Sequence, residues 1–202
     1  MLHGLRLKGL AEEPAIERLT GLPRADVDTQ LAKLEADGLV RHRAGKVSGW
    51  SLTAAGRADH TEAITADVAA AGCRREVKDL YEAFLLLNPT LLSVCTDWQV
   101  RPPAGGHQQA NDHSDAGYDD DVVVRLGVVD AAVQPVCAQL GSLLDRCAHY
   151  GPRLTNARVR VERGERQWFT GAAVDSYHAV WFELHEDLLA TLGITRGTEV
   201  GS

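Results

Sequence analysis

The sequence predicts a mainly α-helical protein, in which a small N-terminal domain of three helices and a β-hairpin precedes an antiparallel helical bundle. Two patterns predict this architecture. Apolar residues recur at helical spacing along most of the 202 residues, whereas short extended segments bounded by turn residues occur between positions 39 and 52. We therefore divide the chain into an N-terminal domain of residues 1–72 and a helical domain of residues 73–202.

Three short helices are expected at the N-terminus, and each can bury one side. The second covers residues 14–19, and Gly21-Leu22-Pro23 makes the turn before the third. The third helix ends at Gly38, which suits a left-handed C-terminal cap. The apolar positions that we expect to form this small core are Leu2, Leu5, Leu7, Leu10, Ala15, Ile16, Leu19, Val27, Leu31 and Leu34.

A basic hairpin follows the third helix. Residues 39–43 and 50–52 have the pattern of two short strands, the glycines of 44–49 supply the turn, and Thr53 is a helix N-cap. The outer face of the third helix and the hairpin carry side chains that can contact phosphates or read base edges. These candidate DNA-binding residues are Arg24, Thr29, Gln30, Lys33, Arg41, His42, Arg43 and Lys46.

Three stretches of the sequence resemble the winged-helix domain of MarR-like and PadR-like bacterial transcriptional regulators. They are Gly21-Leu22-Pro23, Leu31-x-x-Leu34-x-x-Asp37-Gly38-Leu39-Val40 and Trp50-Ser51-Leu52-Thr53-x-x-Gly56-Arg57. The resemblance covers about the first third of the chain. It implies a winged helix-turn-helix whose partner is a double-stranded DNA operator. A winged helix used for docking another protein is the alternative, which the basic hairpin disfavours.

The charge of the chain is unevenly distributed. The formal net charge is −7, but residues 1–60 contain nine Lys or Arg and eight Asp or Glu, whereas residues 61–202 contain 12 and 20. The overall acidity therefore does not exclude DNA binding, because binding depends on the local charge of the reading surface.

Composition also bears on the compartment. No apolar run approaches the roughly 20 residues that a membrane span requires, and the N-terminus lacks the layout of a signal peptide. The cysteines show no CxxC pairing, which favours buried thiols in a reducing compartment over a disulfide framework or a zinc finger. We expect a cytoplasmic protein without a membrane partner, and a redox-sensing cysteine pair is the alternative for these thiols.

The helical domain is expected to contain only helices and loops. An alanine-rich helix over 54–71 leads into it, and the next helix is expected to stop at Asn88-Pro89. Residues 91–98 carry a further apolar segment, and residues 100–117 are expected to be a loop. The remaining helices are predicted over 118–133, 135–149, 152–163 and 172–192.

Aromatic and polar side chains gather in three stretches of this domain, around positions 95–101, 111–118 and 175–186. Aromatic walls with a few polar groups are typical of small-molecule pockets. The predicted ligand-binding residues are Trp98, Asp112, His113, Tyr177, His178 and Trp181. The alternative is that the tryptophans are core anchors. The domain also resembles the C-terminal helical domains of uncharacterised actinobacterial winged-helix regulators, through residues 111–115, 150–154 and 181–188, but this resemblance implies no ligand.

No cofactor is expected. His178 and His185 lie seven residues apart, about 10 Å along a helix axis, which is too far for both to bind one ion. A metal held by one of them together with Asp112, His113 or His149 is the alternative.

No nucleophile elbow or phosphate-binding glycine loop is present, so we expect no enzyme. We expect a homodimeric transcriptional regulator whose helical domain dimerises and senses a small molecule. The alternative is a DNA-binding or docking protein with no effector.

Overall fold

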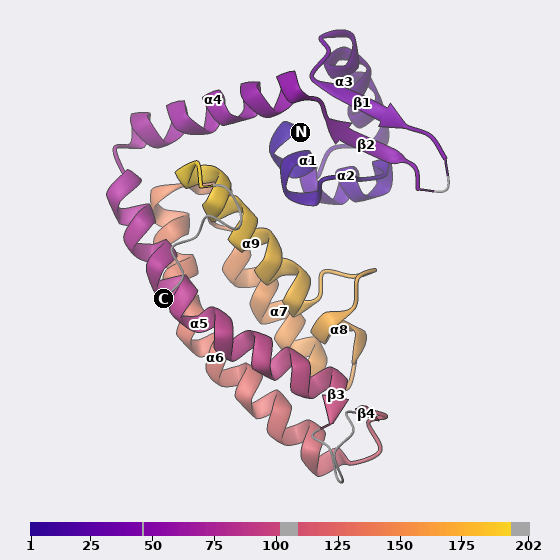
Figure 1. Ribbon diagram of the computed structural model, residues 1–202, viewed down its shortest axis with the longest axis vertical. Coiled ribbons are helices and arrows are strands. Elements are labelled where there is room, and N and C mark those ends of the chain that lie inside the picture. Colours follow the sequence, from indigo (N-terminus) through magenta and orange to yellow (C-terminus); the bar gives the residue numbers. More distant parts are fainter. Residues whose placement is uncertain (46, 102–108, 195–202) are drawn as a thin grey trace. The chain divides into compact units, whose positions relative to one another are not determined.

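The computed structural model describes residues 1–45, 47–101 and 109–194, and helices make up 73% of the described residues and strands 7%. The mainly α-helical fold class is therefore confirmed. The chain divides into two compact units, one comprising Met1–Gly72 with Leu189–Ser202 and the other Cys73–Leu188 (Figure 1). We had placed the whole of residues 73–202 in the helical domain, whereas the described residues 189–194 group with the first unit.

The first unit has the helix and hairpin order of a winged helix. Its elements are α1 (Leu2–Lys8), α2 (Glu13–Thr20), α3 (Arg24–Ala36), β1 (Val40–Arg43), β2 (Gly49–Leu52) and α4 (Ala54–Ala71). The two strands pair antiparallel, and Ala11 adds a bridge to Trp50 that we had not predicted. Its core comprises Leu5, Ala11, Ile16, Val27, Leu31, Val40 and Leu52. The predicted core residues Leu2, Ala15 and Leu34 pack against it, and the side chain of Leu19 lies outside the described part.

The junctions of the winged helix follow its local sequence. Gly38 has a φ of 72°, which is the left-handed conformation expected after a helix. The Thr53 hydroxyl accepts a hydrogen bond from Gly56 N at 3.0 Å, so the predicted N-cap of α4 is confirmed. The backbone of α4 approaches the wing so closely that a Cβ atom at Gly56 would lie 1.9 Å from Leu39 O. A glycine is therefore required where α4 crosses the chain that enters the hairpin.

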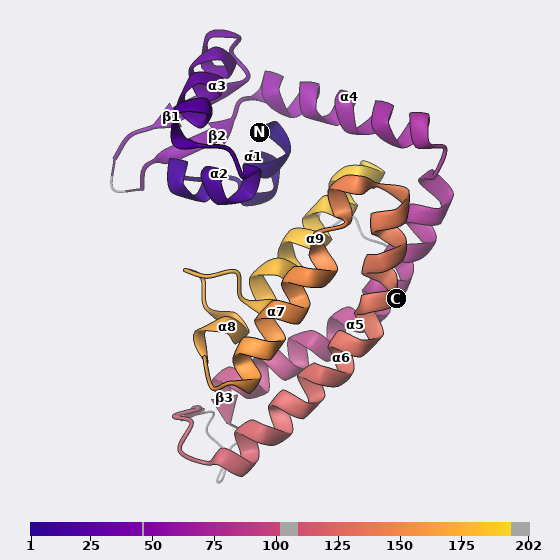
Figure 2. The same ribbon diagram turned by 180° about the vertical axis from the view of Figure 1, so that it is seen from behind.

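The second unit is a bundle of helices connected by short segments. Its elements are α5 (Arg74–Gln99), β3 (Val100–Arg101), β4 (Gln109–Ala110), α6 (Ala116–Leu143), a 3-10 turn (Asp145–Cys147), α7 (Tyr150–Glu162), α8 (Gln167–Thr170) and α9 (Tyr177–Leu192), of which the residues up to Leu188 belong to this unit. Helices α5 and α6 run antiparallel side by side, and α7 lies along α6 (Figure 2). Apolar residues of α5, α6, α7 and α9 form its core.

Two helices are longer than we predicted. Helix α5 continues through Pro89, where we expected a break at Asn88-Pro89, and α6 continues through Pro135, where we expected two helices over 118–133 and 135–149. A proline removes one backbone hydrogen bond from a helix. The apolar stripe of α5 nevertheless continues beyond Pro89 with Leu91 and Val94, which are fully buried. Burial on both sides of the proline therefore outweighs the lost bond.

The segment that we expected to be an irregular loop over 100–117 contains a small hairpin. Strands β3 and β4 pair antiparallel, with Val100 opposite Ala110 and Arg101 opposite Gln109. Residues 102–108 lie outside the described residues. A ladder of two residue pairs has no apolar alternation to mark it in the sequence, which explains why it was missed.

Candidate nucleic-acid interface and helical-domain cleft

Helix α3 presents a polar strip to solvent. Val27 and Leu31 are buried in the core of the first unit, which turns Thr29, Gln30 and Lys33 outward, where they are exposed. The Thr29 hydroxyl donates to Ala25 O at 2.8 Å, so this side chain offers a ligand acceptor lone pairs only. Gln30 and Lys33 make no side-chain hydrogen bond or ion pair with the described part of the chain, and their donors are available.

Arg24, also predicted to contact DNA, is engaged within the unit. It lies in the first turn of α3, where its guanidinium pairs with Asp28 at 2.8 Å and with Glu17 at 3.5 Å. The hydrogen bond that Arg24 donates to the Asp28 carboxylate raises the pKa of Arg24 above its ordinary value. These acidic partners compete with a phosphate for Arg24. The sequence analysis did not anticipate this competition.

The wing divides its basic residues between two faces. Arg41 pairs with Ser51 and Arg43 with Gly49 across the hairpin, so the two arginines, two residues apart, point to the same face and are exposed. Neither makes an ion pair within the described residues. His42 lies on the opposite face, with its ring 5.0 Å from that of Trp50. Lys46, the remaining wing residue of the prediction, lies outside the described residues.

His42 belongs to a small polar network at the base of the wing. The indole N–H of Trp50 donates to Glu13 at 3.0 Å, and this bond lowers the pKa of the Glu13 carboxyl. The backbone N–H of His42 donates to Glu35 at 3.4 Å. The ring of His42 therefore lies against Trp50, and among the described residues of the hairpin Arg41 and Arg43 supply the positive charge that is not ion-paired.

The six residues predicted to line one pocket of the helical domain do not come together. Trp98 and His113 are neighbours, with ring centroids 4.5 Å apart. Tyr177 and Trp181 are buried elsewhere, because Tyr177 donates to Asp130 at 3.3 Å and Trp181 donates to Asn88 at 3.1 Å. Asn88 and Trp98 are ten residues apart on α5, about 15 Å along its axis.

The single-pocket prediction is therefore wrong, and Tyr177 and Trp181 are core anchors. Trp181 packs on Phe84 with ring centroids 4.5 Å apart. The two remaining predicted ligand residues, His178 and Asp112, do not line a pocket with Trp98 and His113 either. His178 is partly buried on α9, and exposed Asp112 accepts hydrogen bonds from the backbone and hydroxyl of Ser114, which lower its pKa. Asp112 thus forms a turn and does not line a pocket.

Asn111 organises the site around His113. Its amide nitrogen donates to Trp98 O at 3.1 Å and to Asp119 Oδ1 at 2.9 Å, while its amide oxygen accepts from the backbone N–H of His113 at 3.1 Å. Both amide hydrogens are then used, so the Nδ1 of His113, 2.9 Å from Asp119 Oδ2, carries a proton and donates to that carboxylate. In a neutral ring, this tautomer leaves Nε2 as a hydrogen-bond acceptor.

The backbone at His113 is strained. Its φ of 59° is the only positive φ of a non-glycine residue in the described ranges. Left-handed backbone at a non-glycine residue costs free energy and is found most often at functional sites. The guanidinium of Arg166 donates a hydrogen bond to the carbonyl oxygen of His113 at 3.2 Å, and this bond helps to hold the conformation of His113.

A cleft of about 190 Å³ opens beside this cluster. Trp98 forms one wall, held between His113 and Phe169, whose ring stacks on the indole at 4.5 Å. The lining residues are Trp98, His113, Ala116, Asp119, Asp120, Val123, Val161, Glu162, Gly164 and Arg166. The indole N–H of Trp98, a side chain only 5% exposed, finds no acceptor within the described ranges. The cleft thus combines an aromatic wall with a free donor and a free acceptor.

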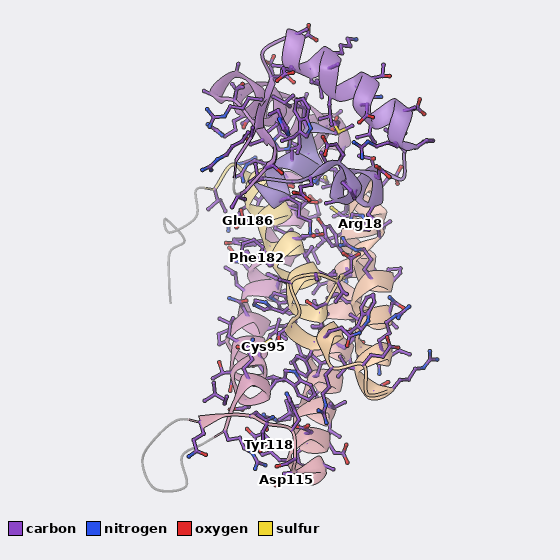
Figure 3. All side chains as sticks on the ribbon, turned by 90° about the vertical axis from the view of Figure 1, so that its right-hand side faces the viewer. Arg18, Cys95, Asp115, Tyr118, Phe182 and Glu186 are labelled. Carbon is purple, nitrogen blue, oxygen red and sulfur yellow. The ribbon has the colours of Figure 1, made fainter. Side chains whose placement is uncertain are left out.

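The entrance to α6 is held by a separate cluster. The Asp115 side chain caps α6 by accepting from Tyr118 N at 3.1 Å, and it pairs with Arg101 at 2.8 Å, which lowers the pKa of its carboxyl. The Arg101 guanidinium also lies 4.5 Å above the ring of Tyr118. Figure 3 shows Asp115 and Tyr118 together at this end of the bundle. These contacts fix the chain on both sides of Asn111 and His113.

Sequence reasoning found Trp98 and His113 but missed Asn111, Asp119, Arg166 and Phe169. Asn111 was visible in the stretch 111–115. Asp119 begins a run of three aspartates, a pattern typical of a solvated helix start, yet it is only 9% exposed and bonded to Asn111 and His113. Arg166 and Phe169 are about 50 residues further along the chain, and no sequence pattern connects them with this site.

The thiols and histidines show no metal arrangement. No group of three or more His, Cys, Asp or Glu side chains able to hold an ion occurs in the ranges that the structure describes. The four cysteines are buried and free, and burial raises the pKa of Cys95, Cys137 and Cys147 to about 12.

Among the described residues, no helix has the length and apolar character needed to cross a membrane. A scan against models of known protein families, a search of curated proteins and a search of solved structures found no match to this chain. The functional argument therefore rests on the geometry of the two units.

Proposed function

We propose that the protein is a DNA-binding transcriptional regulator, whose winged helix reads duplex DNA and whose helical unit binds a small effector and pairs two copies. The observation that carries the DNA-binding part is the arrangement of the wing. Two exposed arginines, which form no ion pair with any residue that the structure describes, share one face of a hairpin that follows a helix with an exposed polar strip. The proposal assigns no catalytic role.

Helix α3 and the wing have different roles in DNA recognition. Helix α3, with 13 residues about 20 Å long, has the length of helices that enter the major groove. Gln30 can form paired hydrogen bonds with an adenine edge, and Lys33 can reach a phosphate or a guanine. The helix itself carries three acidic and two basic residues, so Arg41 and Arg43 supply most of the attraction to the phosphate backbone.

The cleft beside His113 supports an effector role. A volume near 190 Å³ suits a ligand of about ten non-hydrogen atoms, far below the size of a drug-sized pocket. The Trp98 wall favours a flat or cationic group, His113 Nε2 accepts a hydrogen bond, and the indole N–H donates one. We propose a small planar metabolite with both donor and acceptor groups as the effector.

Selection from a random duplex library tests the DNA-binding proposal. The full chain should enrich a defined sequence, and Gln30→Ala should relax the preference at one base position, with a loss of about 1–3 kcal/mol for the preferred duplex. Lys33→Ala should weaken binding to all sequences similarly. Gln167→Ala, at an exposed position of α8, is the matched control and should behave like wild type. No enrichment and no binding by the wild-type chain would refute the proposal.

Native mass spectrometry tests the effector proposal. Wild-type protein purified from its own host should retain a small molecule, which His113→Ala should lose and the control His178→Ala should keep. The identified molecule should change DNA affinity by the same factor by which DNA changes its own affinity. If wild-type protein carries no ligand and only the dimer is found, the helical unit serves dimerisation alone.

A further inference from the structure

Helices α5 and α6 share an exposed face that carries no charge. We call this the α5–α6 face and define it by Leu86, Thr90, Ser93, Val124, Val128 and Pro135, which are all exposed. Three of them are large apolar residues with high exposed fractions, 80% for Leu86, 67% for Val124 and 66% for Val128. Isolated apolar residues are common on protein surfaces, but such a grouping indicates an interaction site.

Helix geometry places these residues together. Helices α5 and α6 are antiparallel neighbours (Figure 1). The ion pair between Asp97 and Arg125 at 2.7 Å fixes their register at one end. Val124 and Val128 are one turn apart on α6, and Pro135 is two turns further on. The buried sides of both helices face the bundle core, so these residues point away from it.

The chain excludes charge from this face over a long stretch. No charged residue occurs between Glu82 and Asp97 on α5, and Asp130 is the one charged residue between Arg125 and the end of α6 at Leu143. Asp130 is buried and pairs with Arg158 at 2.9 Å. Beyond the ion pair of Asp97 and Arg125, the exposed positions of both stretches are therefore apolar or neutral.

We propose that the α5–α6 face binds the same face of a second copy of this chain, about a two-fold axis. Two-fold symmetry places equivalent side chains of the two copies near each other at the axis, so a charged face would oppose like charges there. Residues 61–202 carry 20 acidic and 12 basic residues, and two such units repel each other. An uncharged face allows close approach despite this repulsion.

The size of the face suits a dimer. The α5 stretch between Glu82 and Asp97 has 14 residues, and the α6 stretch after Arg125, with the buried Asp130 as its one charge, has 18, about 21 and 27 Å along the axes. Two helices whose axes lie about 10 Å apart then present a face with an area of about 500 Å² on each copy. The two copies would together bury about 1,000 Å², which reaches the lower limit of specific interfaces. Four helices would pack together in this interface, two from each copy.

The proposed partner deepens the proposed function and rests on it, since one winged helix contacts only half of a two-fold operator. The mass measurement below uses no DNA, so the two can fail separately. A monomer that binds DNA specifically would overturn the dimer interface and leave the regulator. A dimer that binds no DNA would overturn the regulator and leave the dimer interface.

Light scattering coupled to size-exclusion chromatography of the full chain tests the inference. Wild type should elute with about twice the 21.9 kDa mass of one chain and should dissociate on dilution. Val128→Lys and Leu86→Lys should each weaken the dimer by at least about 100-fold, because both copies carry the new charge. Leu92→Lys, at an exposed apolar position on another side of α5, is the matched control and should remain dimeric.

Circular dichroism melting separates loss of the interface from loss of folding. The lysine variants should retain the helical signal of wild type, since these positions are exposed. A wild-type chain that stays monomeric at all micromolar concentrations would overturn the inference. So would a folded Val128→Lys variant that dimerises as wild type does, or a Leu92→Lys control that dissociates equally.

Discussion

Removal of the two free arginines of the wing should change the salt dependence of DNA binding by a calculable amount. Arg41 and Arg43 point to one face of the hairpin, are exposed and make no ion pair within the described residues, so each can neutralise one phosphate. Each phosphate contact contributes about 0.9 to the logarithmic salt slope, so the double variant Arg41→Ala/Arg43→Ala should lose about 1.8 per bound winged helix.

Fluorescence anisotropy with a labelled duplex of random sequence measures this slope without knowledge of the operator. Binding is titrated between about 50 and 200 mM salt, a range over which each contact changes affinity by a factor of about 3.5. The double variant should therefore approach wild type as salt increases, because the lost contacts are those that salt weakens. Its folding should be unchanged, since both side chains are exposed.

The control removes the same charge from the other unit. Arg75 and Arg163 are exposed, and Arg75→Ala/Arg163→Ala changes the net charge of the chain by the same amount. This control should keep the wild-type slope. The assignment of the wing to the phosphate backbone is refuted if the wing variant also keeps that slope, or if the control lowers it equally.

Two further predictions concern stability. Gly56→Ala should lower the free energy of unfolding by at least about 3 kcal/mol, because its Cβ would lie 1.9 Å from Leu39 O, while Gly127→Ala, with no atom within 4 Å of its Cβ, should be neutral or stabilising by up to about 1 kcal/mol. Urea denaturation of both variants compares them, and equal effects would contradict the close approach of α4 to the wing. Burial lowers the pKa of His149 below its ordinary 6.5, and the positive charge of Arg153 lowers it further by a smaller amount. The unfolded chain then binds more protons just below pH 6.5, so the free energy of unfolding should fall on acidification through that pH. His149→Asn should show a shallower fall in thermal melting between pH 7.5 and 5.5, and an unchanged pH profile would show that His149 does not contribute.

The winged helix could be predicted from the sequence because its signals are local. The spacing of Val27 and Leu31, the left-handed Gly38 and the N-cap Thr53 each depend on neighbouring residues, and all three have the predicted conformations. Local sequence signals did not predict the contacts of Arg24. Its acidic partners Asp28 and Glu17 lie on the same and the preceding helix, and only the packing of α2 against α3 brings Glu17 within reach.

In the helical unit, composition and spacing determined that helices form, but tertiary packing determined where they end and which side chains meet. Pro89 is a strong local signal for a helix end, yet burial of the apolar stripe on both sides of it keeps α5 continuous. Trp98 and Trp181 were both predicted to line one pocket, but Trp98 lines a cleft with His113 and Trp181 anchors the core with Asn88.

The physical reason is the range of the interactions. Hydrogen bonds and side-chain contacts within one or two helical turns are encoded by residues close in sequence, so the sequence alone determined the elements of the winged helix and its caps. The cluster of Asn111, His113 and Asp119 borders a cleft only because two residues about 50 positions further along the chain pack beside it. Arg166 contacts His113, and Phe169 stacks on Trp98. Only the tertiary structure decided that arrangement, because it depends on which helices lie beside one another.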